Sequence, residues 1–189
     1  HFDEASPEQT LTSGRGHSNP KGALFASMSN AVGIEAHQHF VRLHPSVLDG
    51  VLPNPLPPAL LHSFVEEEVG DGYISVRVDG YVADRSLFDA AKQLLNLEGK
   101  SIGYRIRSDG TVEWDGKSDC FCQMVDSAVG KPLEREGGGG QVTEDLGCFD
   151  DPVMSLYRTE ANFQRLPFLV GLLFGVLARG INRRIDIIR

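Results

Sequence analysis

The sequence has few cysteines and lacks the motifs of the common nucleotide-binding and hydrolytic sites. Its 189 residues include three cysteines, too few for the disulfide scaffold of a small secreted domain. It contains no G-x-G-x-x-G, no G-x-x-x-x-G-K-[ST], no G-x-S-x-G and no H-E-x-x-H. These absences argue against a phosphate-binding loop, a nucleophile elbow and a helical zinc-protease site. We therefore expect a protein that is not an enzyme and that carries no cofactor.

Basic residues are scarce over most of the chain. Residues 1–151 contain 24 acidic against 12 basic residues, a net charge of −12, whereas residues 152–189 contain 2 against 6, a net charge of +4. Nucleic acid needs a basic footprint on the protein. The acidic balance of the larger part therefore excludes nucleic acid as an expected partner.

The positive charges at the C-terminal end flank the most apolar stretch, the thirteen-residue run 166–178. A helix that spans a bilayer needs about 20 such residues, because about 30 Å of hydrocarbon is crossed at about 1.5 Å per residue. Thirteen residues are more typical of a buried core helix or an interfacial segment. The flanking arginines can lift their charged ends toward the interface and so lengthen the usable span. They are Arg165, Arg179, Arg183 and Arg184.

The same run contains a G-x-x-x-G pattern at Gly171 and Gly175, with Ala178 one turn further along the same face. Small residues at this spacing let two helices approach closely in lipid. Each glycine costs an exposed helix about 1 kcal/mol relative to Ala, so a packing role would explain their presence. The alternative is a C-terminal helix buried in a soluble domain. We favour the transmembrane helix, packed against a partner through these three residues.

Together these features predict a non-catalytic accessory subunit of a membrane protein complex with a single transmembrane helix. Its acidic body would lie on the lumenal or outer side and its basic C-terminus on the matrix or stromal side, following the positive-inside rule. Residue 1 is His rather than Met, which favours a mature chain whose targeting segment has been removed; an arbitrary fragment is the alternative. The expected setting is the mitochondrial inner membrane or the thylakoid, with lipid and the other subunits as partners. A soluble binding module and a metal-dependent enzyme are the alternative functions.

Composition and turn signals divide the chain into four regions. We expect an extended N-terminal arm over residues 1–22, an acidic α+β body over 23–129, a Gly-rich linker over 130–152, and the apolar helix with its basic tail over 153–189. The arm is polar and turn-rich, without an apolar period. The consecutive glycines 137–140 fit either a natural spacer or an engineered joint.

The clearest fold signal is a strand–helix–strand–hairpin unit over residues 73–114, which predicts an α+β fold with a small sheet. Its parts are a strand over 74–78, a helix capped by Asp84 or Ser86 and ended by Gly99, a strand over 102–106, and a hairpin turn at Asp109-Gly110. Before it we expect a helix from Asn19-Pro20 to Gly33 and then a strand over 34–44. The apolar residues of that helix follow at helical spacing and are Leu24, Phe25, Met28, Ala31 and Val32. A proline-rich connection over 45–58, a short helix from Pro57 or Pro58 through Val65 and a solvated acidic face at 66–68 follow.

A strand over 34–44 would place Glu35, His37 and His39 on one face, because side chains alternate along a strand. Imidazole and carboxylate groups on one face can bind one metal ion. No fourth ligand follows at a diagnostic spacing, and alternating polar residues on a strand usually face water. These three residues are therefore weak metal candidates.

The odd number of cysteines leaves at least one of them unpaired. Cys148 can form a disulfide with Cys120 or Cys122, which would fit an oxidising lumen. Three reduced, buried thiols are the alternative. Cys120-Phe121-Cys122 is not a C-x-x-C pair, so a cluster or zinc site would need ligands from elsewhere in the chain.

Overall fold

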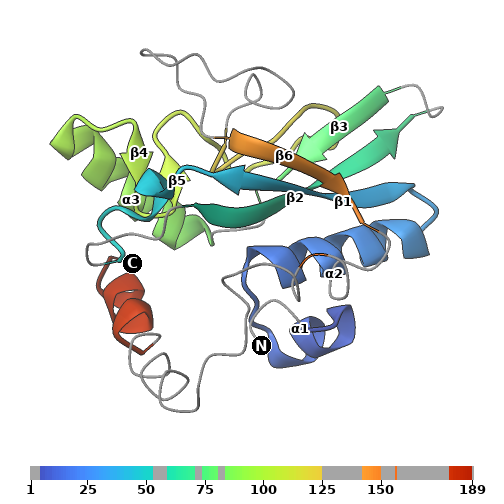
Figure 1. Cartoon of the computed structure of the whole chain (residues 1–189), viewed down its shortest axis with the longest axis horizontal. Coiled ribbons are helices and arrows are strands. Elements are labelled where there is room, and N and C mark those ends of the chain that lie inside the picture. Colours follow the sequence, from blue (N-terminus) through green and yellow to red (C-terminus); the bar gives the residue numbers. More distant parts are fainter. Residues whose placement is uncertain are drawn as a thin grey trace.

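A computed structural model of the chain describes residues 5–52, 59–70, 74–80, 84–124, 142–149, 156 and 179–188, and Figure 1 shows how its elements are arranged. In chain order they are α1 (Pro7–Ser13), α2 (Ser18–Ala31), β1 (Ala36–Leu43), the 3-10 helix η1 (Pro45–Leu48), β2 (Leu60–Val69), β3 (Ile74–Val78), α3 (Arg85–Glu98), β4 (Ile102–Gly103), β5 (Ile106–Arg107) and β6 (Val142–Cys148). Residues 179–188 form a further helical segment. The predicted α+β class is confirmed.

Four antiparallel strands form the main sheet, in the order β3-β2-β1-β6. β1 and β2 are its long central strands, and β6 lies along the outer side of β1 (Figure 1). Residues 142–148, which we expected to belong to a linker, are therefore a strand of the sheet. The glycines 137–140 lie outside the described residues.

The N-terminal segment is not an extended arm throughout, because residues 7–13 form helix α1. Ser6 caps this helix in a capping box with Gln9, and Pro7 occupies the first helical turn. A capping box satisfies two backbone N–H groups at once, and proline is well suited to the first turn. α1 packs on α2 (Figure 1). This local signal outweighs the absence of an apolar period.

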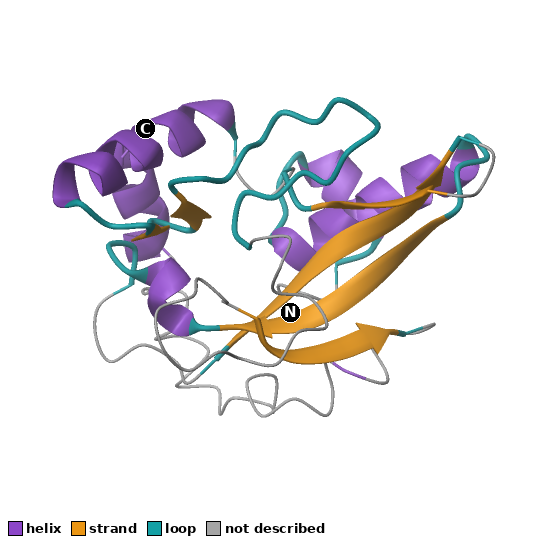
Figure 2. Ribbon diagram, turned by 90° about the horizontal axis from the view of Figure 1, so that it is seen from above, coloured by secondary structure: helices purple, strands orange, loops and turns teal. Residues whose placement is uncertain are grey.

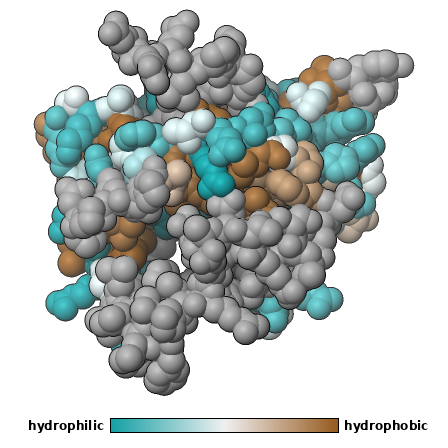
Figure 3. Space-filling view, in the orientation of Figure 1, coloured by the Kyte–Doolittle hydropathy of each residue, from teal (hydrophilic) through white to brown (hydrophobic). Residues whose placement is uncertain are grey.

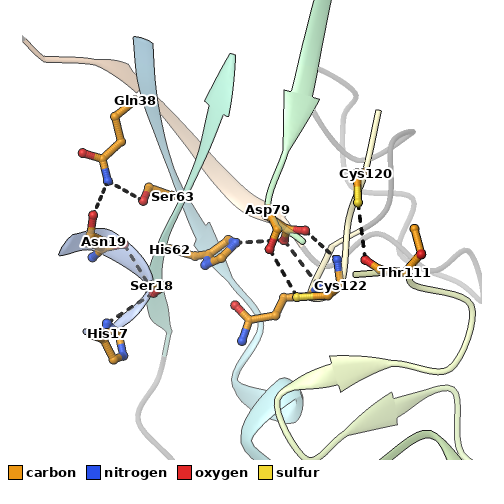
Figure 4. Close-up of polar contacts among 11 residues, drawn as sticks. His17, Ser18, Asn19, Gln38, His62, Ser63, Asp79, Thr111, Cys120 and Cys122 are labelled. Atoms are coloured by element: carbon orange, nitrogen blue, oxygen red, sulfur yellow. Dashed lines mark hydrogen bonds and ion pairs between the residues drawn. The ribbon is translucent and has the colours of Figure 1, made fainter. Parts of the chain in front are cut away.

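Helix α2 lies against one face of β1 and β2, as predicted in position but not in the face that it buries. The residues that face the protein are mostly small or polar and include Ser18, Asn19, Gly22, Ala26 and Ser29. Met28 and Val32, which belong to the predicted apolar face, are 56% and 75% exposed. The sheet beneath α2 is itself polar: Gln38 Nε2 donates hydrogen bonds of 2.7 Å to both the Asn19 carbonyl and Ser63 Oγ (Figure 4).

Residues 60–65 form the first part of strand β2, so the predicted short helix is wrong. Side chains on both faces of this part of β2 are buried: Phe64 belongs to one apolar cluster and Leu61 to another. A strand covered on both faces shows a continuous apolar run, which periodicity alone cannot distinguish from a helix. The acidic run 66–68 is not uniformly solvated, because Glu67 is 1% exposed and accepts a hydrogen bond from Ser29 Oγ.

Apolar side chains gather over the middle of the sheet in the view of Figure 3, with hydrophilic residues along its upper border. Phe40 and Leu61 are buried in one such cluster with Leu156, against which Leu146 and Phe149 pack. The opposite face of the sheet carries a second cluster built on Val41, Leu43, Phe64, Phe121 and Met124. The two central strands are therefore covered on both sides.

Helix α3 confirms the strongest sequence prediction. The Asp84 side chain accepts from the Leu87 N–H at 2.9 Å, and Gly99 ends the helix at φ 64°, where glycine avoids the Cβ penalty. Its apolar face, with Leu87, Phe88, Ala91 and Leu95, is buried.

The predicted hairpin is present, but its position is wrong. β4 and β5 form a separate two-stranded sheet, and the turn between them is Tyr104-Arg105, both with positive φ, at 51° and 70°. Two tertiary bonds hold this unfavourable turn: the Tyr104 N–H donates to Asp49 O and the Arg105 N–H to Val47 O, both at 2.7 Å. Asp109-Gly110 follows the hairpin instead of forming it.

The helical segment 179–188 packs on the same core as α3. Ile185 is buried there, with Ile181 and Ile188 packed against the cluster, and Arg184 Nε donates to the Gly50 carbonyl at 3.3 Å. In both ribbon views this helix lies at the α3 end of the molecule (Figures 1 and 2). Residues 179–188 thus lie beside the body.

Within the described residues, no helix combines the length and the apolar character needed to cross a bilayer. The apolar run 166–178 lies outside those residues, together with Arg165, Gly171, Gly175 and Ala178. Its placement in a bilayer stays a prediction.

Candidate functional site

The three metal candidates from the sequence lie on or next to β1 but do not converge. His37 Nε2 lies 3.1 Å from Glu35 Oε1, and the two side chains are 60% and 61% exposed. His39 instead makes polar contacts with residues of β2 and β6. The predicted set therefore divides into an exposed pair and one half-buried histidine.

His39 is the centre of a polar cluster across three strands. Its ring stacks on Phe64, with centroids 4.8 Å apart, and its side chain is 14% exposed. Nε2 lies 2.6 Å from Asp145 Oδ1. Nδ1 faces two groups, Glu66 Oε2 at 3.3 Å and Cys148 Sγ at 3.8 Å. The imidazole is therefore held by one partner at each nitrogen, with a thiol beside Nδ1.

A bulge in β6 places both Asp145 and Cys148 at this site. Cys148 pairs with His39 and Asp145 pairs with Val41, so one residue of β6 is additional between them. Without it, residues three apart would point to opposite faces of the sheet. Gly147 has φ 76°, a conformation that glycine adopts without the strain of an L-residue. The bulge therefore brings a carboxylate and a thiol to one face.

Three pKa shifts follow from these contacts. Burial by itself lowers the pKa of His39, but the hydrogen bonds with Glu66 and Asp145 outweigh burial and raise the pKa above its ordinary value of 6.5. The hydrogen bond from His39 is the main cause that lowers the pKa of Glu66. Burial, followed by the charges of Glu66 and Asp145, raises the pKa of the Cys148 thiol. These shifts favour a protonated imidazole, an ionised Glu66 and a protonated thiol.

Arg77 borders the cluster on β3, directly opposite Glu66 in the sheet register. Its guanidinium is already bound by Asp119, with Nη2 at 2.5 Å and Nε at 3.1 Å from Oδ2, and lies 5.3 Å above the Phe121 ring. The charge of Arg77 contributes to the lowered pKa of Glu66 after the effect of His39. The Glu66 carboxylate thus lies between the His39 ring, with which it forms a hydrogen bond, and the positive charge of Arg77.

The atoms around Nδ1 have the spacing of metal ligands. His39, Glu66 and Cys148 each offer one ligand atom, all within 4.8 Å of one another. Around a tetrahedral zinc ion, bonds of about 2.1 Å to N and O and about 2.3 Å to S place N about 3.4 Å from O and about 3.6 Å from S. The corresponding distances here are 3.3 Å and 3.8 Å.

Asp145 is placed as the outer partner of such a ligand. A histidine that binds a metal through one nitrogen usually donates its other N–H to a carboxylate, which fixes the ring. The distance of 2.6 Å from His39 Nε2 to Asp145 Oδ1 fits this role. Asp145 Oδ1 also accepts the Gly147 N–H at 3.0 Å, so the bulge that brings the carboxylate also orients it.

A second polar cluster lies inside the protein and has a structural role (Figure 4). His62 Nε2 lies 3.1 Å from Asp79 Oδ2, and both side chains are fully buried. Asp79 Oδ1 accepts the Cys122 N–H at 2.5 Å, and Oδ2 accepts the Gln123 N–H at 3.3 Å. Asp79 thus attaches the segment around Cys122 to the end of β3.

All three cysteines are thiols, so no disulfide joins Cys148 to Cys120 or Cys122. Cys120 and Cys122 are buried, which agrees with the reduced-thiol alternative, whereas Cys148 is exposed at the sheet edge. Burial raises the pKa of Cys120 to about 11. Cys148 is the thiol that solvent reaches.

Two open hollows on the described surface lie away from this cluster. One is lined by residues of α1, and the other by residues of α3 and 110–113. The His39 cluster therefore lies on the sheet surface, outside both.

Comparison of the chain with protein-family models, with curated proteins and with solved structures finds no match. The function is therefore inferred from the geometry of its own residues. His39 was among the sequence candidates, whereas Glu66, Asp145 and Cys148 were not recognised as its partners.

Proposed function

We propose that this protein binds one divalent transition-metal ion, with zinc as the best fit, between His39, Glu66 and Cys148. The observation that carries the proposal is the environment of His39. One ring nitrogen faces a carboxylate and a thiol at the spacing of a coordination sphere, and the other nitrogen is held by Asp145. The ion would replace the proton on Nδ1 and the proton of the Cys148 thiol.

The donor set supports a transition metal over calcium or magnesium. Hard cations prefer six or more oxygen ligands, whereas thiolate and imidazole suit zinc and its neighbours in the first transition series. A doubly charged ion would also offset the negative charges of Glu66 and Asp145 and favour the thiolate of Cys148. Without a metal ion, burial and these two carboxylates raise the pKa of the Cys148 thiol and so disfavour the thiolate.

The same residues also resemble a Cys–His–Asp arrangement for nucleophilic catalysis, but the charges around Cys148 oppose that function. A reactive cysteine needs a lowered thiol pKa, set by cations, a metal or a helix N-terminus. Here burial and two carboxylates raise the pKa of Cys148, and Glu66 competes with the thiol for Nδ1 of His39. Metal binding accounts for Glu66, which a thiol nucleophile would not need.

Zinc titration against a chromophoric chelator tests the proposal. We expect one ion per chain, and we expect Glu66→Gln and Cys148→Ser each to weaken binding strongly. Glu68→Gln is the matched control, because it makes the same charge change on the same strand at an exposed position. Cobalt(II) should give a thiolate-to-metal charge-transfer absorption that Cys148→Ser abolishes. Absence of stoichiometric zinc from the wild-type protein at equilibrium would overturn the proposal.

The single-pass accessory subunit remains a second proposal, supported by the apolar run 166–178, its flanking arginines and the acidic balance of residues 1–151. It is compatible with a metal-binding body. Alkaline carbonate extraction of native membranes tests it, since an integral chain stays with the membrane and a peripheral one is released. Replacing Gly171 and Gly175 with Leu should release the subunit from its complex on a native gel; unchanged assembly would exclude the packing role.

A further inference from the structure

We infer, on the basis of the metal site proposed above, that His37 is the fourth ligand and turns from Glu35 to close the coordination sphere. His39, Glu66 and Cys148 supply three donor atoms, whereas zinc sites without a catalytic role usually have four protein ligands. The fourth ligand must come from the same face of the sheet and must be able to move. His37 meets both conditions.

The strand register places His37 beside the site. It precedes His39 by two residues on β1, and so lies on the same face. It is also the direct cross-strand partner of Glu66. Side chains of directly opposed residues start about 4.5–5.5 Å apart at their Cβ atoms, close enough to contact each other. Glu66 therefore lies level with His37 and diagonally across from His39.

The present contact of His37 can be exchanged. Its imidazole bonds Glu35 across 3.1 Å, but both side chains are more than half exposed, and exposed ion pairs of this kind contribute little to stability. The side chain of His37 is 60% exposed, which gives the ring room to change rotamer. A metal–imidazole bond would therefore replace a weak, solvated contact.

Other nearby acidic groups are less suitable as the fourth ligand. Asp145 already holds the opposite nitrogen of His39, where it orients the ring. Glu68 lies on the same face as Glu66, but it is two residues further from His39 along the sheet. Its N–H donates to the carbonyl of Glu35, whereas Glu66 lies opposite His37. Among these residues, His37 is the one that offers a nitrogen atom as a metal ligand.

The resulting set of two imidazoles, one carboxylate and one thiolate would leave no position for a metal-bound water. Zinc enzymes need such an open position, where water is activated. The inference therefore assigns the ion a binding or structural role. The site would also join β6 to β1 and β2 through one ion.

Zinc affinity and the cobalt(II) spectrum of four proteins test the inference. We expect His37→Ala to weaken zinc binding at least about tenfold, the lower end of the loss seen when even an outer-shell partner is removed. Its cobalt visible bands should weaken as water enters, while the thiolate charge-transfer absorption persists. Glu35→Gln should bind zinc as tightly as wild type or more tightly, because it releases His37. His44→Ala, an exposed histidine just beyond the other end of β1, is the control.

The outcomes separate this inference from the metal site itself. If wild type binds zinc and His37→Ala has a zinc affinity within about twofold of it and the same cobalt spectrum, the role of His37 is overturned. The three-residue site would then remain intact. Failure of the wild-type protein to bind zinc would overturn both. A loss in His37→Ala that equals the loss in His44→Ala would also count against ligation, because it would reflect a general effect of removing a histidine.

Discussion

Replacing Asp145 with Asn tests the chemistry of the site with little change in its shape. Two donors point at Asp145 Oδ1: His39 Nε2 at 2.6 Å and the Gly147 N–H at 3.0 Å. An asparagine can present its amide oxygen to both donors, because each requires an acceptor. Asp145→Asn therefore keeps the hydrogen bonds and removes the negative charge.

The expected loss of zinc affinity is about 10- to 100-fold, the range for mutation of an outer-shell partner of a metal-bound histidine. This corresponds to about 1.4–2.7 kcal/mol in binding free energy. Charge-assisted hydrogen bonds are roughly twice as strong as neutral ones, and Asp145 is 38% exposed, so solvent screening favours the lower half of the range.

The hydrogen bond between Asp145 and His39 also predicts the direction in which the pKa of His39 changes. The Asp145 hydrogen bond is one of the contributions that raise the pKa of His39. In Asp145→Asn, the pKa of His39 should therefore be lower than in wild type, which the ring proton resonances of a pH titration by NMR would report. Affinity is measured by chelator competition on the same samples.

Glu144→Gln is the matched control. Glu144 is the preceding residue on β6 and pairs with Arg42, Nε to Oε2 at 2.6 Å, not with His39. It should leave zinc affinity unchanged. Equal affinity of wild type and Asp145→Asn, or equal losses in Asp145→Asn and Glu144→Gln, would refute an outer-shell role for Asp145.

Three further predictions concern the bulge, the thiols and the core. Gly147→Ala adds a Cβ that meets no atom within 4 Å, but it places an L-residue at φ 76°. Chemical denaturation should therefore show a free energy of unfolding that is lower by about 1–2 kcal/mol. Unchanged stability would exclude strain at the bulge. Brief alkylation of the native protein should label exposed Cys148 and spare buried Cys120, and zinc should protect Cys148; labelling that zinc does not alter would count against thiolate ligation. Leu95 is fully buried in the core, so Leu95→Ala should lower the free energy of unfolding by about 2–5 kcal/mol. Leu97 is 84% exposed, so Leu97→Ala should change it by less than about 0.5 kcal/mol. Similar losses in the two variants would show that α3 does not pack on the core through Leu95.

The parts of the fold that the sequence predicted well are those whose local signals agree with their packing. In α3, the Asp84 cap, the spacing of Leu87 and Leu95, and Gly99 at the end all indicate one helix. In β3, residues 75–78 likewise alternate between buried and more exposed side chains, whereas Ile74 at the start of the strand is 58% exposed. Agreement between cap, period and stop makes such an element predictable from a single sequence.

The elements that were predicted wrongly depend on tertiary contacts that local patterns do not show. The short 60–65 segment has the apolar density of a buried helix but lies between two layers as a central strand. The turn of the β4–β5 hairpin uses Tyr104 and Arg105 in place of the Asp-Gly pair, because backbone bonds to Asp49 and Val47 hold it. In both, the deciding interactions join segments that are distant in sequence.

The candidate site illustrates the same limit. The sequence suggested ligands along a single strand, whereas the contacts of His39 come from two neighbouring strands: Cys148 lies directly opposite it on β6, and Glu66 is its diagonal neighbour on β2. His39 accordingly meets Glu66, 27 residues away, and Cys148, 109 residues away.

The bulge in β6 is what brings Asp145 and Cys148 to the same face of the sheet. Regular alternation would put Asp145 and Cys148 on opposite faces of a strand, so the segment gives no sign of a shared site. Gly147 indicates where a bulge is permitted, but the partner strand decides whether one forms. A strand bulged at that glycine, paired with β1 in this register, is what brings separate acidic, histidine and cysteine positions into one cluster.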